Sequence, residues 1–118
     1  MTRIQHEKKL VVEPIIKKLS SLKFTGEIVW YQRLVAEDDS HCPAGTPDIV
    51  AVVNNGDGTI SLLFIECKRP SKKMWTLDNL KGEQKIFFQK MMTKTRTSCV
   101  VLNNKNQLWS AIEKARNA

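Results

Sequence analysis

The chain has 118 residues, of which 42% are hydrophobic, and its 19 Lys and Arg against 12 Asp and Glu give a formal net charge of +7. This length fits one domain with one hydrophobic core, and the apolar content argues against disorder. The positive charge is typical of a small domain that binds a polyanion, although solubility alone could also account for it. We expect residues 1–118 to form a single domain.

The three cysteines, Cys42, Cys67 and Cys99, show no CxxC spacing. Neither a disulfide framework nor a structural zinc site is therefore expected. The N-terminal segment is polar and charged, unlike a signal peptide, and no apolar run is long enough to span a bilayer. The sequence predicts an intracellular, cytoplasmic protein with no membrane association.

Residues 2–22 are predicted to form the first helix, because apolar side chains recur along them at steps of three, four or seven. These side chains are Ile4, Val11, Ile15, Leu19 and Leu22. The lysines of the segment lie mostly outside this stripe, which predicts a solvated face. Pro14 should kink the helix or mark a restart near Glu13.

Three strand segments follow the first helix. Residues 27–36 are rich in β-branched and aromatic side chains and predict the first strand, which a polar loop over residues 37–46 follows. Residues 47–54 and 60–68 flank the turn sequence Asn55-Gly56-Asp57-Gly58 and are predicted to pair as a hairpin. Both strands are apolar on both faces, which is typical of a sheet covered by helices on both sides.

The remaining segments complete an α/β pattern. A polar connection over residues 71–79 leads into a predicted helix at about 78–93, a strand at 97–102 and a last helix at about 106–115. The order α-β-β-β-α-β-α predicts one central mixed β-sheet flanked by helices.

Two acidic residues border the buried strands of the hairpin. Asp48 directly precedes Ile-Val-Ala-Val-Val, and Glu66 directly follows Leu-Leu-Phe-Ile. If the turn is centred near Asp57, the two acids face each other on one side of the sheet, with Cβ atoms roughly 5 Å apart. Lys68 shares that side, because alternate residues of a strand point the same way, and Cys67 points to the other.

Two carboxylates this close repel each other unless a cation lies between them. Oxygen ligands favour Mg²⁺, Mn²⁺ or Ca²⁺ over zinc, and two carboxylates leave coordination positions for waters and a substrate phosphate, as Mg²⁺ sites usually do. Lys68 could stabilise a phosphoryl-transfer transition state or position the attacking water. The alternative is an ion-pair cluster that does no chemistry. No Gly-rich phosphate-binding loop is present, so no nucleotide cofactor is expected.

At these residues the sequence resembles the PD-(D/E)XK nuclease superfamily, and more narrowly the virus-type replication-repair nuclease (VRR-NUC) domain. That family typically shows a Gly-x-Pro-Asp strand start, a Glu-x-Lys strand end and a Gln early in the next helix. In this chain these are Gly45-Thr46-Pro47-Asp48, Glu66-Cys67-Lys68 and Gln84. The resemblance spans most of the chain, from the first helix to the fourth strand.

The resemblance implies a restriction-endonuclease-like core and metal-dependent hydrolysis of DNA phosphodiesters. It implies that Asp48 and Glu66 bind the metal, with the backbone carbonyl of Cys67 as a further ligand, and that Lys68 orients or activates the nucleophilic water. Stand-alone domains of this size occur in phages and resemble Holliday-junction resolvases. A phage-encoded homodimer that cuts branched DNA inside the bacterial host is therefore expected.

Two further residues are candidates for the site. Gln84 falls within the apolar stripe of the second helix, where it needs a partner; it either faces the site and holds a water or phosphate, or lies wet at the helix border. The superfamily often adds a Glu from the first helix to the metal site. Glu7 lies at the edge of the packed stripe and is favoured over Glu13, which projects to nearly the opposite side.

Basic residues flank the site in the sequence and could contact DNA phosphates without reading sequence. They are Arg33, Arg69, Lys72 and Lys73. Trp75 could stack on an unpaired base or cap the core.

Three functions are compatible with these features. The first is an endonuclease for branched or flapped DNA, the second a sequence-specific restriction-type nuclease, and the third a DNA-binding module without activity. A short chain has little material for sequence recognition. A binding module has no need of two facing acids that repel phosphates.

Overall fold

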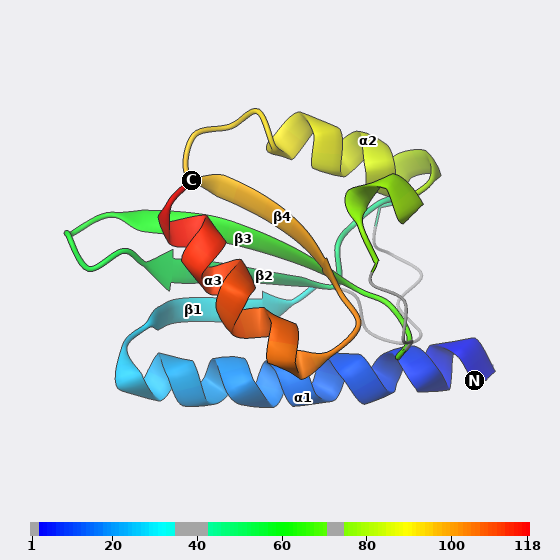
Figure 1. Ribbon diagram of the computed structural model, residues 1–118, viewed down its shortest axis with the longest axis horizontal. Coiled ribbons are helices and arrows are strands. Elements are labelled where there is room, and N and C mark those ends of the chain that lie inside the picture. The colour runs from blue at the N-terminus through cyan, green and yellow to red at the C-terminus, as the bar shows by residue number, and fades with distance from the viewer. Residues whose placement is uncertain (1–2, 35–42, 71–74) are drawn as a thin grey trace.

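The computed structural model describes residues 3–34, 43–70 and 75–118, and the side chains of residues 3–7 are outside that description. The helices and strands follow the predicted order, so the α/β class is confirmed (Figure 1). They are α1 (Arg3–Thr25), β1 (Ile28–Arg33), β2 (Ile49–Asn54), β3 (Ile60–Cys67), the 3₁₀ turn η1 (Leu77–Asn79), α2 (Gly82–Met91), β4 (Thr97–Leu102), the 3₁₀ turn η2 (Lys105–Gln107) and α3 (Leu108–Arg116).

The four strands form one mixed sheet in the order β1-β2-β3-β4. The pairs β1/β2 and β2/β3 are antiparallel, and β3/β4 is parallel, with α2 in the crossover. Ile49 pairs with Ile65 and Asn54 with Ile60, so the register predicted for a turn centred near Asp57 is confirmed. Asp57 holds this turn by accepting a hydrogen bond from the backbone N–H of Thr59 over 2.9 Å.

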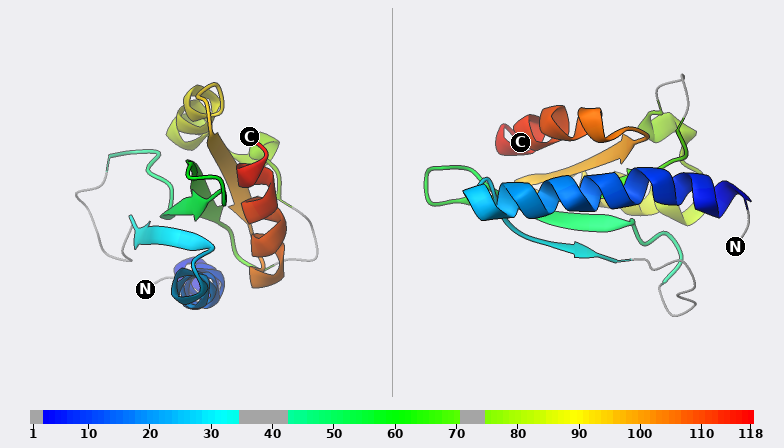
Figure 2. Two further views of the ribbon diagram at one scale, coloured as in Figure 1. Left: turned by 90° about the vertical axis from the view of Figure 1, so that its left-hand side faces the viewer. Right: turned by 90° about the horizontal axis from the view of Figure 1, so that it is seen from below.

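Helices cover both faces of the sheet, as predicted (Figure 2). Helices α1 and α3 pack against one face, and the buried side chains that they contribute are Val11, Val12, Ile15, Leu19, Leu108, Ala111, Ile112 and Ala115. Helix α2 covers the other face at the β3–β4 end, where Phe88 packs with Leu80 and Cys99. Cys67 and Cys99 are buried free thiols, and Cys42 lies outside the described residues.

Helix α1 runs without interruption through Pro14, so the restart predicted near Glu13 is wrong. Proline removes one N–H donor, and the carbonyl four residues earlier loses its partner. That carbonyl belongs to Leu10. Leu10 is 57% exposed, so water can reach this part of the helix. Buried Val12 and Ile15 on either side of Pro14 hold both halves of the helix against the same core.

The helix predicted at 78–93 is shorter in the structure. Leu80 and Lys81 adopt extended backbone conformations, so η1 and α2 are separate elements. The other predicted elements are found within a few residues of their expected limits, and β4 spans the predicted residues. None of the described helices is both long enough and apolar enough to cross a membrane.

Candidate active site

Asp48 directly precedes β2 and is only 4% exposed. Its backbone carbonyl accepts a hydrogen bond from the N–H of Leu34 over 2.7 Å, which ties it to the end of β1. Its side-chain Oδ2 accepts a hydrogen bond from the backbone N–H of Cys67 over 2.7 Å. The carboxylate is therefore turned toward β3, where its partner Cys67 directly follows Glu66, the residue that Asp48 was predicted to face.

Glu66 is near the end of β3 and is 1% exposed, which makes it one of the most deeply buried charged side chains of the described chain. The side-chain amide Nε2 of Gln84 donates a hydrogen bond to Glu66 Oε2. The other oxygen, Oε1, is buried and has no hydrogen-bond partner. A buried acceptor without a hydrogen-bond donor is costly unless a cation lies beside it.

Lys68 and Gln84 form a chain of contacts with Glu66. Lys68 Nζ donates to Gln84 Oε1 over 3.3 Å, and Gln84 uses its other amide atom for Glu66. The structure therefore brings Gln84 into the site rather than leaving it at a wet helix border. Lys68 Nζ also lies 5.9 Å from the ring centroid of half-buried Trp75, within the range of a cation–π contact.

A lysine that the sequence prediction assigned to a solvated face completes the cluster. Lys8 Nζ lies 3.0 Å from Asp48 Oδ1 and 3.7 Å from Glu66 Oε1. Its position was recognisable in the sequence, because Lys8 precedes the buried residues Val11 and Val12 by three and four positions and so lies on their helix face. Lys8 also lies three residues before Val11 and seven before Ile15, so it falls within the predicted apolar stripe rather than outside it.

Burial dominates the electrostatics of the site. Loss of hydration raises the pKa of the Glu66 carboxyl to about 9, and the nearby Asp48 adds to this shift, while Lys8 and Lys68 oppose it. Burial also raises the pKa of the Cys67 thiol well above its ordinary value, which makes this thiol chemically inert. For Lys8, burial lowers the pKa, but the charges of Asp48 and Glu66 outweigh it, and the net shift is upward.

The remaining candidates from the sequence lie apart from the acid pair or outside the description. The side chain of Glu7, and all of Lys72 and Lys73, lie outside the described residues. Glu13 points away, 60% exposed, and pairs with Lys9 at 3.6 Å. Arg69 is exposed just beyond β3. Half-buried Arg33 pairs with Ile49, the residue after Asp48, at the same end of the sheet.

The family of the chain is shown by a match to one family model. The family model of the VRR-NUC domain matches residues 7–105. The chain belongs to the VRR-NUC family. This family is part of the PD-(D/E)XK nuclease superfamily, whose members generally use divalent metals, and a nuclease domain implies DNA as substrate. No curated protein and no solved structure matches the chain.

The donor set of this VRR-NUC domain fits a hard divalent ion. Among the described residues no cluster of three His, Cys, Asp or Glu side chains is found. Two carboxylates with water and backbone oxygens are, however, the usual protein share of a Mg²⁺ site. The observation that supports the fit is Glu66 Oε1, a buried oxygen with no hydrogen-bond donor, beside Asp48 Oδ1.

A glycine of the Gly-x-Pro-Asp motif sets the distance between this loop and α2. Gly45 has φ +86°, and a Cβ atom placed on it would lie 2.5 Å from the backbone oxygen of Glu83, the residue before Gln84. Only glycine permits so close an approach. The motif thus positions Gln84 as well as Asp48.

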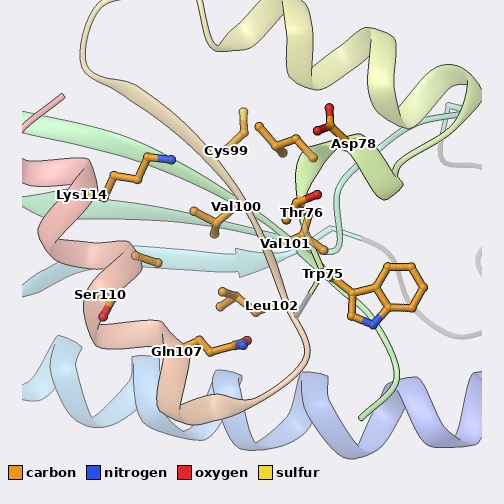
Figure 3. Close-up of a pocket in the computed structure, with 12 residues that line it drawn as sticks. Trp75, Thr76, Asp78, Cys99, Val100, Val101, Leu102, Gln107, Ser110 and Lys114 are labelled. Carbon is orange, nitrogen blue, oxygen red and sulfur yellow. The ribbon is translucent and has the colours of Figure 1, made fainter. Parts of the chain in front are cut away.

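A cavity of about 540 Å³ opens between β4 and α3, with Trp75 among its lining residues (Figure 3). Asp48 and Glu66 are not part of its lining. Trp75 is half-buried and lies between Lys68 and this cavity, where it lines the wall together with the core residues Val100 and Leu102.

The raised pKa of Glu66 predicts how stability depends on pH without metal. Between about pH 4.5, the ordinary value, and about 9, the folded protein keeps a proton that the unfolded chain releases. The associated stability is complete at the acid end and is lost as the pH rises through this window, by at most about 1.4 kcal/mol per pH unit. Urea unfolding in a chelator should show this fall for wild type but not for Glu66→Gln. A constant difference between the two proteins from pH 5 to 9 would contradict the prediction.

The close approach at Gly45 predicts a specific sensitivity to substitution. Gly58 has nearly the same φ, +88°, but nothing within 4 Å of an added Cβ, so it is a matched control. Gly45→Ala should be less stable to urea than Gly58→Ala by about 1–3 kcal/mol, because it must push α2 away. Equal losses in the two variants would show that the contact with Glu83 is unimportant.

Proposed function

We propose that this VRR-NUC protein is a divalent-metal-dependent endonuclease that hydrolyses DNA phosphodiesters, with branched DNA as its preferred substrate. The observation that carries the proposal is the buried pair Asp48 and Glu66. Their oxygens Oδ1 and Oε1 both face the same cationic group, the ammonium of Lys8. A small domain does not need two acids at adjacent ends of buried strands in order to fold. Their burial lowers the stability of the fold, which favours a functional role for the pair.

Asp48 and Glu66 would hold the ion, with the backbone carbonyl of Cys67 as a further donor and Glu7 as the candidate from α1. Hard oxygen donors favour Mg²⁺, with Mn²⁺ as a substitute. When bound, the ion would polarise the phosphoryl group and neutralise charge that develops there. The hydrogen bonds from Cys67 N–H and Gln84 Nε2 hold one oxygen of each carboxylate in place, so the other oxygens, which both face Lys8, lie close together.

Lys68 would orient and activate the attacking water and stabilise negative charge as the phosphodiester is cleaved. Its amine is held by Gln84 at 3.3 Å and lies over Trp75, so the long side chain has a defined position. Gln84 has both of its amide atoms engaged, one with Lys68 and one with Glu66. It would therefore link the position of the amine to that of the acid.

The charge of the chain favours recognition of DNA by shape. Arg33 and Arg69 lie at the same end of the sheet as the acid pair, and Lys72 and Lys73 continue the basic sequence. Such side chains contact phosphates and confer affinity without reading bases. We propose that these side chains bind the phosphates around a branch point in DNA. The protein would act inside the cell, in the host bacterium if the chain is phage-encoded.

A homodimer would supply the two sites that symmetric cutting of a four-way junction needs. A row of apolar side chains crosses β1, β2 and β3 on the face opposite α1. Trp30 of β1 pairs with Val52 of β2, and Val52 pairs with Leu62 of β3. Trp30 is 46% exposed, because among the described elements α2 reaches only the β3–β4 end of this face. We propose this row as the dimer contact.

The activity is tested by incubating the protein with Mg²⁺ or Mn²⁺ on duplex, flap and four-way-junction DNA. Lys68→Ala should reduce the single-turnover cleavage rate by roughly 10²-fold or more, because it removes the group that positions water. Arg69→Ala is the matched control, since it should weaken DNA binding and its salt dependence but preserve the cleavage rate at saturation.

The substrate pattern distinguishes the candidate functions. Symmetric cuts in the junction support a resolvase, and cutting of linear duplex at one sequence would replace the proposal by a restriction-type nuclease. Tight binding with no cleavage of any substrate would make the protein a binding module.

The dimer contact is tested by Trp30→Glu, with Trp109→Glu on α3 as control, since Trp109 is similarly exposed at 39%. Light scattering should report a dimer for wild type and Trp109→Glu, and a monomer for Trp30→Glu, because a buried charge disrupts an apolar contact. A monomeric wild type, or dissociation by the control alone, would refute this surface.

A further inference from the structure

The oxygens of the acid pair are divided between two kinds of partner. Asp48 Oδ2 is bound by the backbone N–H of Cys67, and Glu66 Oε2 by the amide of Gln84. The other oxygen of each acid, Asp48 Oδ1 and Glu66 Oε1, faces the ammonium group of Lys8 at 3.0 and 3.7 Å. Lys8 therefore lies against the same two oxygens that a metal ion would use.

The position of Lys8 follows from the packing of α1. The lysine is one turn before Val11 and Val12, which are buried against the sheet, so its side chain leaves the helix toward the ends of β2 and β3. Its neighbour Lys9 points elsewhere and pairs with Glu13 at 3.6 Å. The two lysine side chains are similarly exposed, 31% and 35%, and differ mainly in the acids that they meet.

We propose that Lys8 is a built-in counter-ion that holds the acid pair together in the metal-free protein and that a divalent ion must displace. This inference rests on the proposed metal site. A protein ammonium and a divalent cation cannot share the two oxygens, because like charges repel strongly where water is scarce. Lys8 is thus a positioning residue that stabilises the empty site and lowers its affinity for metal.

Displacement also gives Lys8 a second position. The lysine has four rotatable carbons between its amine and α1, so the ammonium can move aside while its backbone stays fixed. Released beside a metal site, it becomes available for a phosphate oxygen of DNA. Metal binding and DNA binding would then support each other, since each favours the displaced lysine.

Lys8→Met and the control Lys9→Met test the competition in the absence of DNA. The two variants make the same chemical change in the same helical turn. Calorimetric titration with Mn²⁺ should show roughly tenfold tighter binding for Lys8→Met than for wild type or Lys9→Met. In a chelator, Lys8→Met should also melt about 5 °C below Lys9→Met, because the acid pair has lost its counter-ion.

The outcomes separate this inference from the proposed function. Equal Mn²⁺ affinities in wild type and Lys8→Met would overturn the role of Lys8 but leave the metal site in place. Failure of wild type and both variants to bind Mn²⁺ would overturn the metal site itself.

A second measurement needs no variant. Lysine acetylation of the wild-type protein, followed by mass spectrometry, reports how accessible each amine is. Mn²⁺ should accelerate modification of Lys8 and leave that of Lys9 unchanged, because only Lys8 is released from an acid pair. Protection or no change at Lys8 at saturating Mn²⁺ would refute the displacement.

Discussion

The structure depends on one costly arrangement, the burial of Asp48 and Glu66 side by side at the ends of paired strands. Two carboxylates in such surroundings destabilise a fold unless each finds partners. The surrounding residues supply them, namely a strand N–H from Cys67, an amide from Gln84 and an ammonium from Lys8. Each partner comes from a different element, so the acid pair joins β3, α2 and α1 at one end of the sheet (Figure 1).

The sheet makes this convergence possible. The hairpin register brings the start of β2 beside the end of β3, and the parallel β3–β4 pair requires a crossover that carries α2 over the same end. Gly45 then lets the loop before Asp48 approach Glu83 closely enough for Gln84 to reach Glu66. Backbone geometry thus positions the polar side chains, and their charges decide what can bind between them.

The hairpin and its acids could be predicted because local rules determine them. A dense turn sequence fixed the register, and side-chain alternation then brought Asp48 to face Glu66 and sent Cys67 into the core. Lys8 was missed for a different reason. Its place on the apolar stripe follows from the sequence, but the acids that hold it come from β2 and β3, and that contact depends on how α1 packs against the sheet.

The same limit explains the errors in the helices. Pro14 is a strong local signal for interruption, yet burial of Val12 and Ile15 on either side maintains α1 through it. The early start predicted for α2 followed the apolar periodicity through Leu80, which packs with Phe88 while its own backbone is extended. In both cases packing against the sheet outweighs the local preference of the chain.

Two features reduce the buried negative charge of the metal-free site, and binding of a metal at the proposed site would reverse both. A proton on Glu66 and the ammonium of Lys8 both reduce the negative charge that would otherwise be buried there. A divalent ion at the proposed site would replace both, so part of its binding energy would be used to remove them. The affinity for metal would consequently be lower than two carboxylates alone would give. In the proposed mechanism, a DNA phosphate would add ligands for the ion and a partner for the released lysine, and it would thereby offset that loss.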